Sequence, residues 1–249
     1  MEYIFIFVLG ALIGSFLNVL IVRIPKDENV AFPASHCVTC KKPLKPWHNI
    51  PIVSWLVLRG KCAFCEAKIS PQYPIVELLS GIIFLAVFMK MGIAVPTLGI
   101  ALAFLMLLTL SVIDFYYKMV PDSLNLLALT LAIVSVYSFE MLTEHAVHAL
   151  LFAGAFSLLR FYISYIIKQE AMGEADIMIA ATMGALLGVK LTLVAIFLSA
   201  LLALPAMMLM RNETDESKQV PFIPFLAMAT WIVFIFDTPI MNYLDRMYG

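Results

Sequence analysis

Long apolar segments separated by short polar ones make up most of the chain. A membrane-spanning helix needs about 20 apolar residues, and the candidate segments are 3–22, 75–92, 97–114, 122–139, 147–167, 176–189, 191–210 and 220–237. Residues 25–74, between the first two segments, are polar and rich in proline, which disfavours long helices. The pattern predicts an all-α polytopic membrane protein of about eight transmembrane helices with a small loop domain.

The composition agrees with this class. The 249 residues are 63% hydrophobic and 13% charged, whereas a soluble domain carries about 25% charged residues. The first apolar segment differs from a cleaved secretory signal, because Glu2 is its only early charge and no clear small-residue cleavage site follows. We therefore expect it to remain as the first transmembrane helix.

The basic residues indicate an orientation, because Lys and Arg collect on the cytoplasmic side of membrane proteins. With the N-terminus outside, twelve of the 16 basic residues face the interior: Arg23, Lys26, Lys41, Lys42, Lys45, Arg59, Lys61, Lys68, Lys118, Lys168, Arg211 and Lys218. Lys90, Lys190 and Arg246 face the exterior, and Arg160 falls within the fifth span. The expected division is a first transmembrane helix (1–24), a cytoplasmic four-cysteine loop domain (25–74) and a membrane-embedded helix bundle (75–249).

Four cysteines form two C-x-x-C pairs, Cys37 with Cys40 and Cys62 with Cys65. Two such pairs can close a tetrahedron of thiolates around zinc with no position left for water, which makes the site structural. A metal of this kind can fold a short segment that has too little core of its own. Two disulfides or free thiols are the alternative, and a reducing cytoplasm disfavours disulfides. We expect the nearby His36 and His48 to be polar loop residues rather than ligands.

Two aspartates lie where predicted spans meet water on the cytoplasmic side. Asp114 ends the third span and Asp176 opens the sixth. Ionisable residues at membrane depth tend to mark functional sites, and two carboxylates that meet can share one proton and activate one water. Taken singly, Asp114 has a simple alternative as an interfacial carboxylate and Asp176 as a helix-start residue. Asp122, after Pro121, is expected to start and cap the next helix.

Two other functional classes fit paired acids and a cysteine loop in a membrane protein. One is a proton-coupled membrane carrier, and the other is a non-catalytic zinc-bearing scaffold of a secretion or pilus assembly. A carrier would place its acids near the bilayer midplane and would show inverted repeats. The sequence shows no repeat and places both acids at the membrane edge.

Small residues recur four positions apart in two of the spans. Gly10 and Gly14 do so in the first span, and Ala180, Gly184 and Gly188 do so in the sixth. Such spacing predicts close approach of helix backbones. The polar stretch 211–219 is expected to be a solvated loop.

Motifs spread over nearly the whole chain are similar to those of one family. They are Gly14-Ser-Phe-Leu-Asn-Val19 with Arg23-Ile-Pro25, the cysteine pairs around Asn49-Ile-Pro51 and Ser54-Trp-Leu56, Ile69-Ser-Pro-Gln-Tyr-Pro74 with Glu77, Asp114 with Pro121-Asp122, Gly173-Glu-Ala-Asp176, and Pro221-Phe-Ile-Pro-Phe225. Together they resemble the bacterial type IV prepilin peptidases, also called leader peptidase/N-methyltransferases. In this chain, Ala175 stands where the family's G-x-G-D motif usually has its second glycine, and Met178 where a lysine commonly follows.

The resemblance implies an aspartic endopeptidase of the bacterial inner membrane with Asp114 and Asp176 as its catalytic pair. Such an enzyme removes the basic leader from type IV prepilins or pseudopilins at the cytoplasmic face. The resemblance also implies N-methylation of the new N-terminus with S-adenosyl-L-methionine, although no G-x-G-x-x-G motif marks a nucleotide site. The expected partners are these protein substrates and membrane lipid, with no nucleic acid.

Overall fold

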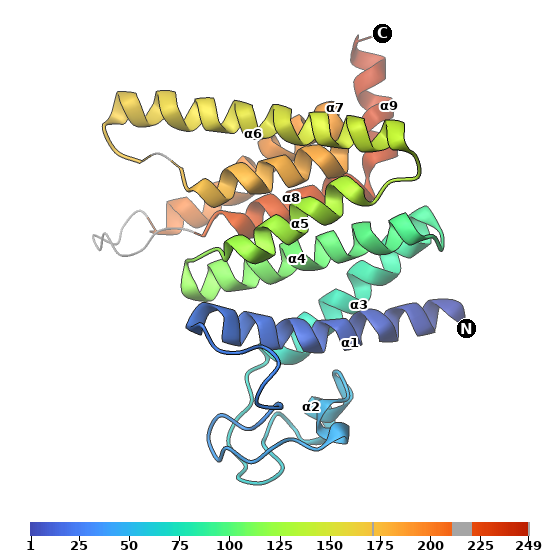
Figure 1. Ribbon diagram of the computed structural model, residues 1–249, viewed down its shortest axis with the longest axis vertical. Coiled ribbons are helices and arrows are strands. Elements are labelled where there is room, and N and C mark those ends of the chain that lie inside the picture. The colour runs from blue at the N-terminus through green and yellow to red at the C-terminus, as the bar shows by residue number, and fades with distance from the viewer. Residues whose placement is uncertain (171, 211–220, 249) are drawn as a thin grey trace. The chain divides into compact units, whose positions relative to one another are not determined.

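The computed structural model describes residues 1–170, 172–210 and 221–248. It divides into two compact units, Met1–Gly92 and Ile93–Gly249. Each unit is built from helices (Figure 1), and the only β-type pairing among the described residues is two isolated bridges in the first unit. The predicted all-α fold is therefore confirmed.

The first unit is a pair of apolar helices joined by a loop domain. Helices α1 (Glu2–Arg23) and α3 (Gln72–Met91) pack against each other along their lengths. A Cβ atom built on Gly10 would lie 2.5 Å from Cβ of Phe84, and one on Gly14 would lie 2.7 Å from Cβ of Ser80. The close approach predicted from the small residues of the first span is confirmed.

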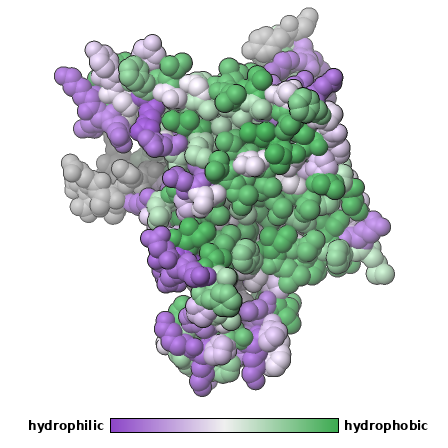
Figure 2. All heavy atoms as spheres, in the orientation of Figure 1, coloured by the Kyte–Doolittle hydropathy of each residue, from purple (hydrophilic) through white to green (hydrophobic). Residues whose placement is uncertain are grey.

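The connection between α1 and α3 contains only short helical segments: η1 (Ile24–Lys26), η2 (Pro46–Asn49) and α2 (Val53–Val57). The buried guanidinium of Arg23, at the end of α1, donates hydrogen bonds to the carbonyls of Asn29, Val30 and Pro33 at 2.9, 3.1 and 2.6 Å. The loop is mostly hydrophilic on the face shown in Figure 2, whereas the helices are covered by hydrophobic side chains.

The second unit contains the remaining helices. They are α4 (Val95–Tyr117), α5 (Asp122–Val134), α6 (Phe139–Ile167), α7 (Glu174–Met210), α8 (Ile223–Ile235) and α9 (Asp237–Tyr248). Both α5 and α8 pack against α4 and also against α7, and α6 packs along α7. Helices α5 and α8 therefore join α4 to α7.

The expected number of eight spans is approximate. Among the described residues, five helices are long and apolar enough to cross a membrane, or six if the bent pair α8 and α9, which meet at 80°, counts as one span. The span expected at 122–139 is wrong in length, because α5 ends after 13 residues and Ser138 caps the start of α6 by accepting a hydrogen bond from the Met141 N–H. The loop expected at 211–219 lies outside the described residues.

The spans expected at 176–189 and 191–210 are the two parts of α7. They join at Gly188, whose φ of 71° and ψ of −179° are not helical. This region of backbone conformation is essentially restricted to glycine. Gly188 therefore breaks the helix, whereas the sequence pattern had suggested a packing role for it.

Candidate functional site

Asp114 lies in the last turn of α4, and its side chain is buried. Its Oδ2 accepts a hydrogen bond of 3.2 Å from the backbone N–H of Ile223, the first residue of α8. The N–H groups of a first helical turn have no acceptor within their own helix, and the positive end of the helix dipole favours a nearby carboxylate. The start of α8 thus fixes one oxygen of Asp114.

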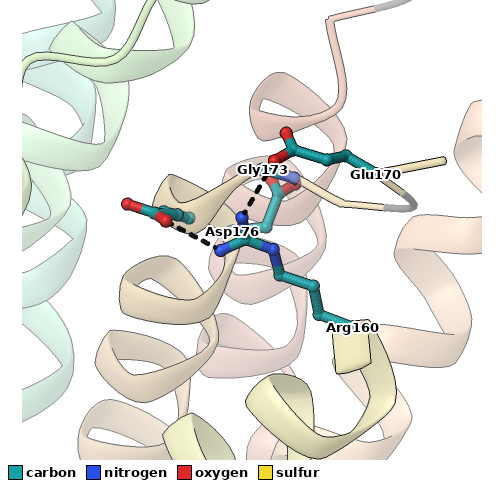
Figure 3. Close-up of polar contacts among 5 residues, drawn as sticks. Arg160, Glu170, Gly173 and Asp176 are labelled. Atoms are coloured by element: carbon teal, nitrogen blue, oxygen red, sulfur yellow. Dashed lines mark hydrogen bonds and ion pairs between the residues drawn. The ribbon is translucent and has the colours of Figure 1, made fainter. Parts of the chain in front are cut away.

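Asp176 is the third residue of α7 and is partly buried. Its Oδ2 accepts a hydrogen bond of 3.2 Å from the N–H of Gly173, the residue before the helix (Figure 3). This bond is the half of a capping box in which the side chain of the third residue reaches back to the helix start. The helix-start role considered for Asp176 is therefore present, and it leaves the other oxygen available.

Both aspartates belong to the second unit of the structure. Asp114 lies on α4 and Asp176 on α7, and both α5 and α8 pack against each of these two helices. Within the described part of the chain, each aspartate uses Oδ2 for a backbone N–H, and neither Oδ1 accepts a hydrogen bond. Asp122 is exposed at the first residue of α5.

The alanine in the Gly173-Glu-Ala-Asp176 motif sits in ordinary helical backbone. Ala175 belongs to the first turn of α7 and is not among the residues with positive φ. The position therefore does not require the conformational freedom of glycine. Its carbonyl accepts a 3.2 Å hydrogen bond from Nδ2 of Asn125 on α5.

Sequence reasoning missed Asn125. It is completely buried in α5, a short and largely apolar helix. A buried amide in such a segment was the available signal, because polar side chains at membrane depth are costly and tend to be functional. Its partner is 50 positions away in the sequence, so the sequence could not show the contact.

Arg160 of α6 holds the segment that leads into α7 (Figure 3). Its guanidinium contacts the carboxylates of Glu174 at 3.1 Å and Glu170 at 3.7 Å. Both glutamates are largely exposed, so these ion pairs contribute little to stability. A cavity of about 420 Å³ borders this segment and is lined by Ser157, Arg160, Phe161, Ser164, Tyr165 and Glu170.

The four cysteines of the first unit form one cluster. Their sulfur atoms all lie within 4.8 Å of one another, and Sγ of Cys37 is 3.8 Å from Sγ of Cys65. All four are free of disulfides. Four thiolates at about 2.3 Å from a tetrahedral zinc would be about 3.8 Å apart, so the cluster fits such an ion.

The two C-x-x-C pairs have the same backbone geometry. In the first, the N–H of Cys37 donates to the carbonyl of Lys42, and the N–H of Lys41 donates to that of Cys37. In the second, the N–H of Cys62 donates to the carbonyl of Ala67, and the N–H of Glu66 donates to that of Cys62. Lys41 and Glu66, which follow the second cysteine of each pair, both have positive φ.

The thiols of this cluster differ in acidity. Backbone N–H donation, chiefly from Cys40, lowers the pKa of Cys37 to about 6. The Ala67 amide favours the thiolate of Cys65, but burial and the three neighbouring thiols outweigh it and raise the pKa of Cys65 to about 11. Several thiolates at this separation repel each other unless a cation lies among them. The cluster can therefore bind a metal such as zinc, while neither His36 nor His48 belongs to it.

Other motif residues of the first unit shape the loop. The buried carboxylate of Glu77 accepts a 2.7 Å hydrogen bond from the N–H of Ile52, whose φ is 63°. The hydroxyl of Ser54 donates to the carbonyl of Trp47 at 2.7 Å, and Nε1 of Trp55 donates to that of Ile69 at 3.2 Å. These contacts give a structural role to residues within the Asn49-Ile-Pro51 and Ser54-Trp-Leu56 region.

Two family models match this chain, and both describe the same kind of peptidase. Residues 8–91 match the model of the bacterial peptidase A24 N-terminal domain, and residues 101–208 match that of the type IV leader peptidase family. No solved structure matches the chain.

Several similar curated proteins share the name prepilin leader peptidase/N-methyltransferase. That of Neisseria gonorrhoeae is 35% identical over 91% of this chain and 88% of its own length. That of Xanthomonas campestris pv. campestris is 33% identical over 97% of this chain and 93% of its own length. That of Pseudomonas aeruginosa is 31% identical over 97% of this chain and 92% of its own length. With several apolar helices long enough to cross a membrane and this similarity over nearly its full length, the chain is a multi-pass membrane protein that belongs to the type IV leader peptidase family.

Proposed function

We propose that this chain is an aspartic endopeptidase that removes leader peptides from prepilins or pseudopilins, with Asp114 and Asp176 as its catalytic pair. The observation that carries the proposal is the placement of two carboxylates, one buried and one partly buried, at helix ends of α4 and α7 in the unit that matches the type IV leader peptidase family. Both acids lie in end turns of their helices rather than at mid-helix. This placement favours a hydrolase over the carrier alternative.

The proposed chemistry is that of two carboxylates that act together on one water and one peptide bond. Two neighbouring carboxylates hold one proton between them, because both do not ionise together at low cost. The ionised group takes a proton from water as the water oxygen attacks the scissile carbonyl carbon, and the protonated group donates to the carbonyl oxygen. The tetrahedral intermediate then breaks its C–N bond, and the leaving nitrogen takes up a proton. The products are the free leader and a mature chain with a new amino terminus.

The backbone contacts suit this assignment. Each Oδ2 is held by an N–H at a helix start, which fixes the carboxylate plane, and each Oδ1 remains available for water or substrate. Catalytic groups function best when their surroundings hold them in the productive geometry before the substrate arrives.

We assign zinc to the cluster of Cys37, Cys40, Cys62 and Cys65 as a structural metal. Four sulfur ligands leave no coordination position for a water or a substrate. The metal would fix the two matched loops around itself and so order a segment with little core of its own.

The relatives' name includes N-methyltransferase, and we propose the same second activity here. S-adenosyl-L-methionine, when bound, supplies the methyl group that the new amino terminus accepts. In the first unit, Asn18 Oδ1, Gln72 Nε2 and Ser80 Oγ are buried and have no hydrogen-bond partner among the described residues. These unsatisfied polar atoms fit a polar ligand, and we assign them to the methyl donor.

We place the loop domain and both aspartates at the cytoplasmic face of the inner membrane. The apolar helices of the protein are in contact with lipid. This orientation is supported by the excess of Lys and Arg on one side of the predicted spans. We also propose the division into a first transmembrane helix (1–24), a loop domain (25–74) and a membrane-embedded bundle (75–249). Trypsin should cut after the exposed Arg59 or Lys68 in inverted membrane vesicles. Cleavage at the same residues in intact spheroplasts would show that the loop domain lies outside, opposite to the proposed orientation.

The central test is replacement of each aspartate. Asp114→Asn and Asp176→Asn should each abolish leader removal from a purified prepilin, because an amide can neither take nor share the proton. The exposed Asp122→Asn is the matched control and should process at close to the parental rate. Product formation is followed by mass spectrometry of the N-terminus.

The same variants separate the alternatives. A correctly inserted Asp114→Asn or Asp176→Asn protein that cleaves at the parental rate would reject the catalytic pair. If the parental protein cleaves nothing but supports proton-coupled flux that the variants lose, the carrier is correct. If neither the parental protein nor the variants show cleavage or proton-coupled flux, the protein is the non-catalytic zinc-bearing scaffold.

A further inference from the structure

Asn125 connects the two segments that carry the aspartates. It lies in the first turns of α5, the helix that follows Asp114 along the chain after the short connection 118–121. Its Nδ2 donates a 3.2 Å hydrogen bond to the carbonyl of Ala175, the residue directly before Asp176. One side chain therefore ties the backbone of the Asp176 segment to the helix next to Asp114.

The other half of the Asn125 amide has no such role in the fold. Its Oδ1 is buried and has no hydrogen-bond partner among the described residues. An unpartnered buried amide oxygen destabilises a folded protein, and an apolar side chain of similar size avoids that cost. Fold stability alone therefore does not favour asparagine at this position, whereas the bond to Ala175 requires a donor.

The bond is placed where it affects the geometry of the pair. Gly173 fixes the carboxylate of Asp176 from the residue before the helix, and Asn125 fixes the peptide group between Ala175 and Asp176. The Ala175 carbonyl lies in the first turn of α7, where a small shift of the backbone would move Asp176 relative to Asp114. Displacements of about 1 Å in an active site can lower a rate by about a hundredfold.

We propose that Asn125 is a positioning residue for hydrolysis: its Nδ2–H group holds the Ala175 carbonyl and thereby sets the place of Asp176 relative to Asp114. The proposal rests on the proposed function, because it concerns the reaction only if the two carboxylates are the reacting pair.

The experiment compares two variants that remove the donor: Asn125→Leu, which has a similar size, and Asn125→Ala, which is smaller. Cleavage of a purified prepilin in detergent micelles gives kcat and KM, and thermal unfolding of the same samples gives Tm. We expect kcat to fall by about tenfold to a hundredfold in both variants. KM should change by less than about threefold, because binding of the substrate is not the step affected.

Stability separates positioning from packing. Asn125→Leu should have a Tm equal to or above that of the parental protein, because it removes the unpartnered oxygen. The matched control is Thr182→Val on α7, which is also fully buried and whose hydroxyl donates to the carbonyl of Met178. This control should retain the parental kcat.

Two outcomes would overturn the proposal. The first is a kcat within about twofold of the parental value in both Asn125 variants, while Asp114→Asn and Asp176→Asn are inactive. The second is a loss of kcat that accompanies a lower Tm and that Thr182→Val reproduces, which would assign Asn125 to packing. Parental cleavage by the two aspartate variants would instead reject the proposed function itself.

Discussion

At the scale of the residue, both aspartates are oriented by backbone rather than by other side chains. The N–H of Ile223 holds Asp114, and the N–H of Gly173 holds Asp176. A backbone donor keeps its position when neighbouring side chains change. Ala175 leaves the bond from Gly173 in place, because it lies in ordinary helical backbone next to Asp176. The structure gives no account of Met178.

The first prediction concerns Ala175. Because its backbone is helical and its φ is not positive, Ala175→Gly should leave kcat within about twofold of the parental value. It should lower the free energy of unfolding by about 0.5–1 kcal/mol, as glycine does in a helix. Steady-state kinetics and thermal unfolding measure the two effects. A several-fold gain in kcat would mean that the alanine restricts the site.

The candidate site illustrates what a sequence can show at this scale. The Asp114 and Asp176 positions followed from their places at the ends of apolar segments, and the cysteine cluster followed from the spacing of two pairs. The roles of Asn125 and of the Ile223 amide did not, because their contacts join residues 50 and 109 positions apart. Long-range contacts of this kind depend on helix packing, which a single sequence does not display.

At the scale of the element, one glycine divides α7. Gly188 has a φ of 71°, and a Cβ atom built on it would meet only the His148 ring, at 3.7 Å. Space is therefore sufficient for a side chain, and the conformation is what requires glycine. The sequence pattern placed separate spans at 176–189 and 191–210, close to this point, but the spacing of small residues did not distinguish a turn from a packing contact.

The second prediction compares two glycines. Gly188→Ala should lower the free energy of unfolding by about 1–3 kcal/mol, the cost of forcing a side chain into that region of backbone conformation. Gly154→Ala on α6 is the matched control, because a Cβ atom there would meet no other atom within 4 Å. The control should be neutral or stabilising by about 0.5–1 kcal/mol. Equal Tm values for the two variants in detergent would show that Gly188 is not conformationally restricted.

The third prediction concerns the metal of the loop. Protein purified without chelator should contain about one zinc per chain, as measured by elemental analysis. Cys37→Ser should lose the metal and make the loop more sensitive to trypsin, because folding of such segments is coupled to metal binding. His36→Gln is the control in the same loop and should keep the metal. Absence of zinc from the parental protein would remove this assignment, while leader cleavage could remain.

At the scale of the whole molecule, the two compact units correspond closely to the two family models. Residues 8–91 match the N-terminal model within the first unit, and residues 101–208 match the peptidase model within the second. The aspartate pair belongs entirely to the second unit, and the cysteine cluster belongs entirely to the first. Hydropathy predicted the helical class. The expected number of eight spans is approximate, because five or six helices among the described residues are long and apolar enough to cross a membrane and α5 is a shorter apolar helix.

The last prediction is that the two activities can be separated by unit and ordered in time. Methyl transfer needs a free amine held beside the donor, so leader removal must come first. With S-adenosyl-L-methionine supplied, the parental protein should release mature pilin with one added methyl group, detected by mass spectrometry.

The variants of each unit test that order. Asp114→Asn should not methylate an uncut prepilin but should methylate a precut one, since its first unit is intact. Gln72→Leu should cleave normally and lose methylation, because it removes one of the unsatisfied polar groups that we assign to the methyl donor. Parental product that stays unmethylated under saturating donor would reduce the chain to a peptidase. Normal methylation by Gln72→Leu would instead place the donor elsewhere, because cleavage in the same sample shows that the protein is folded.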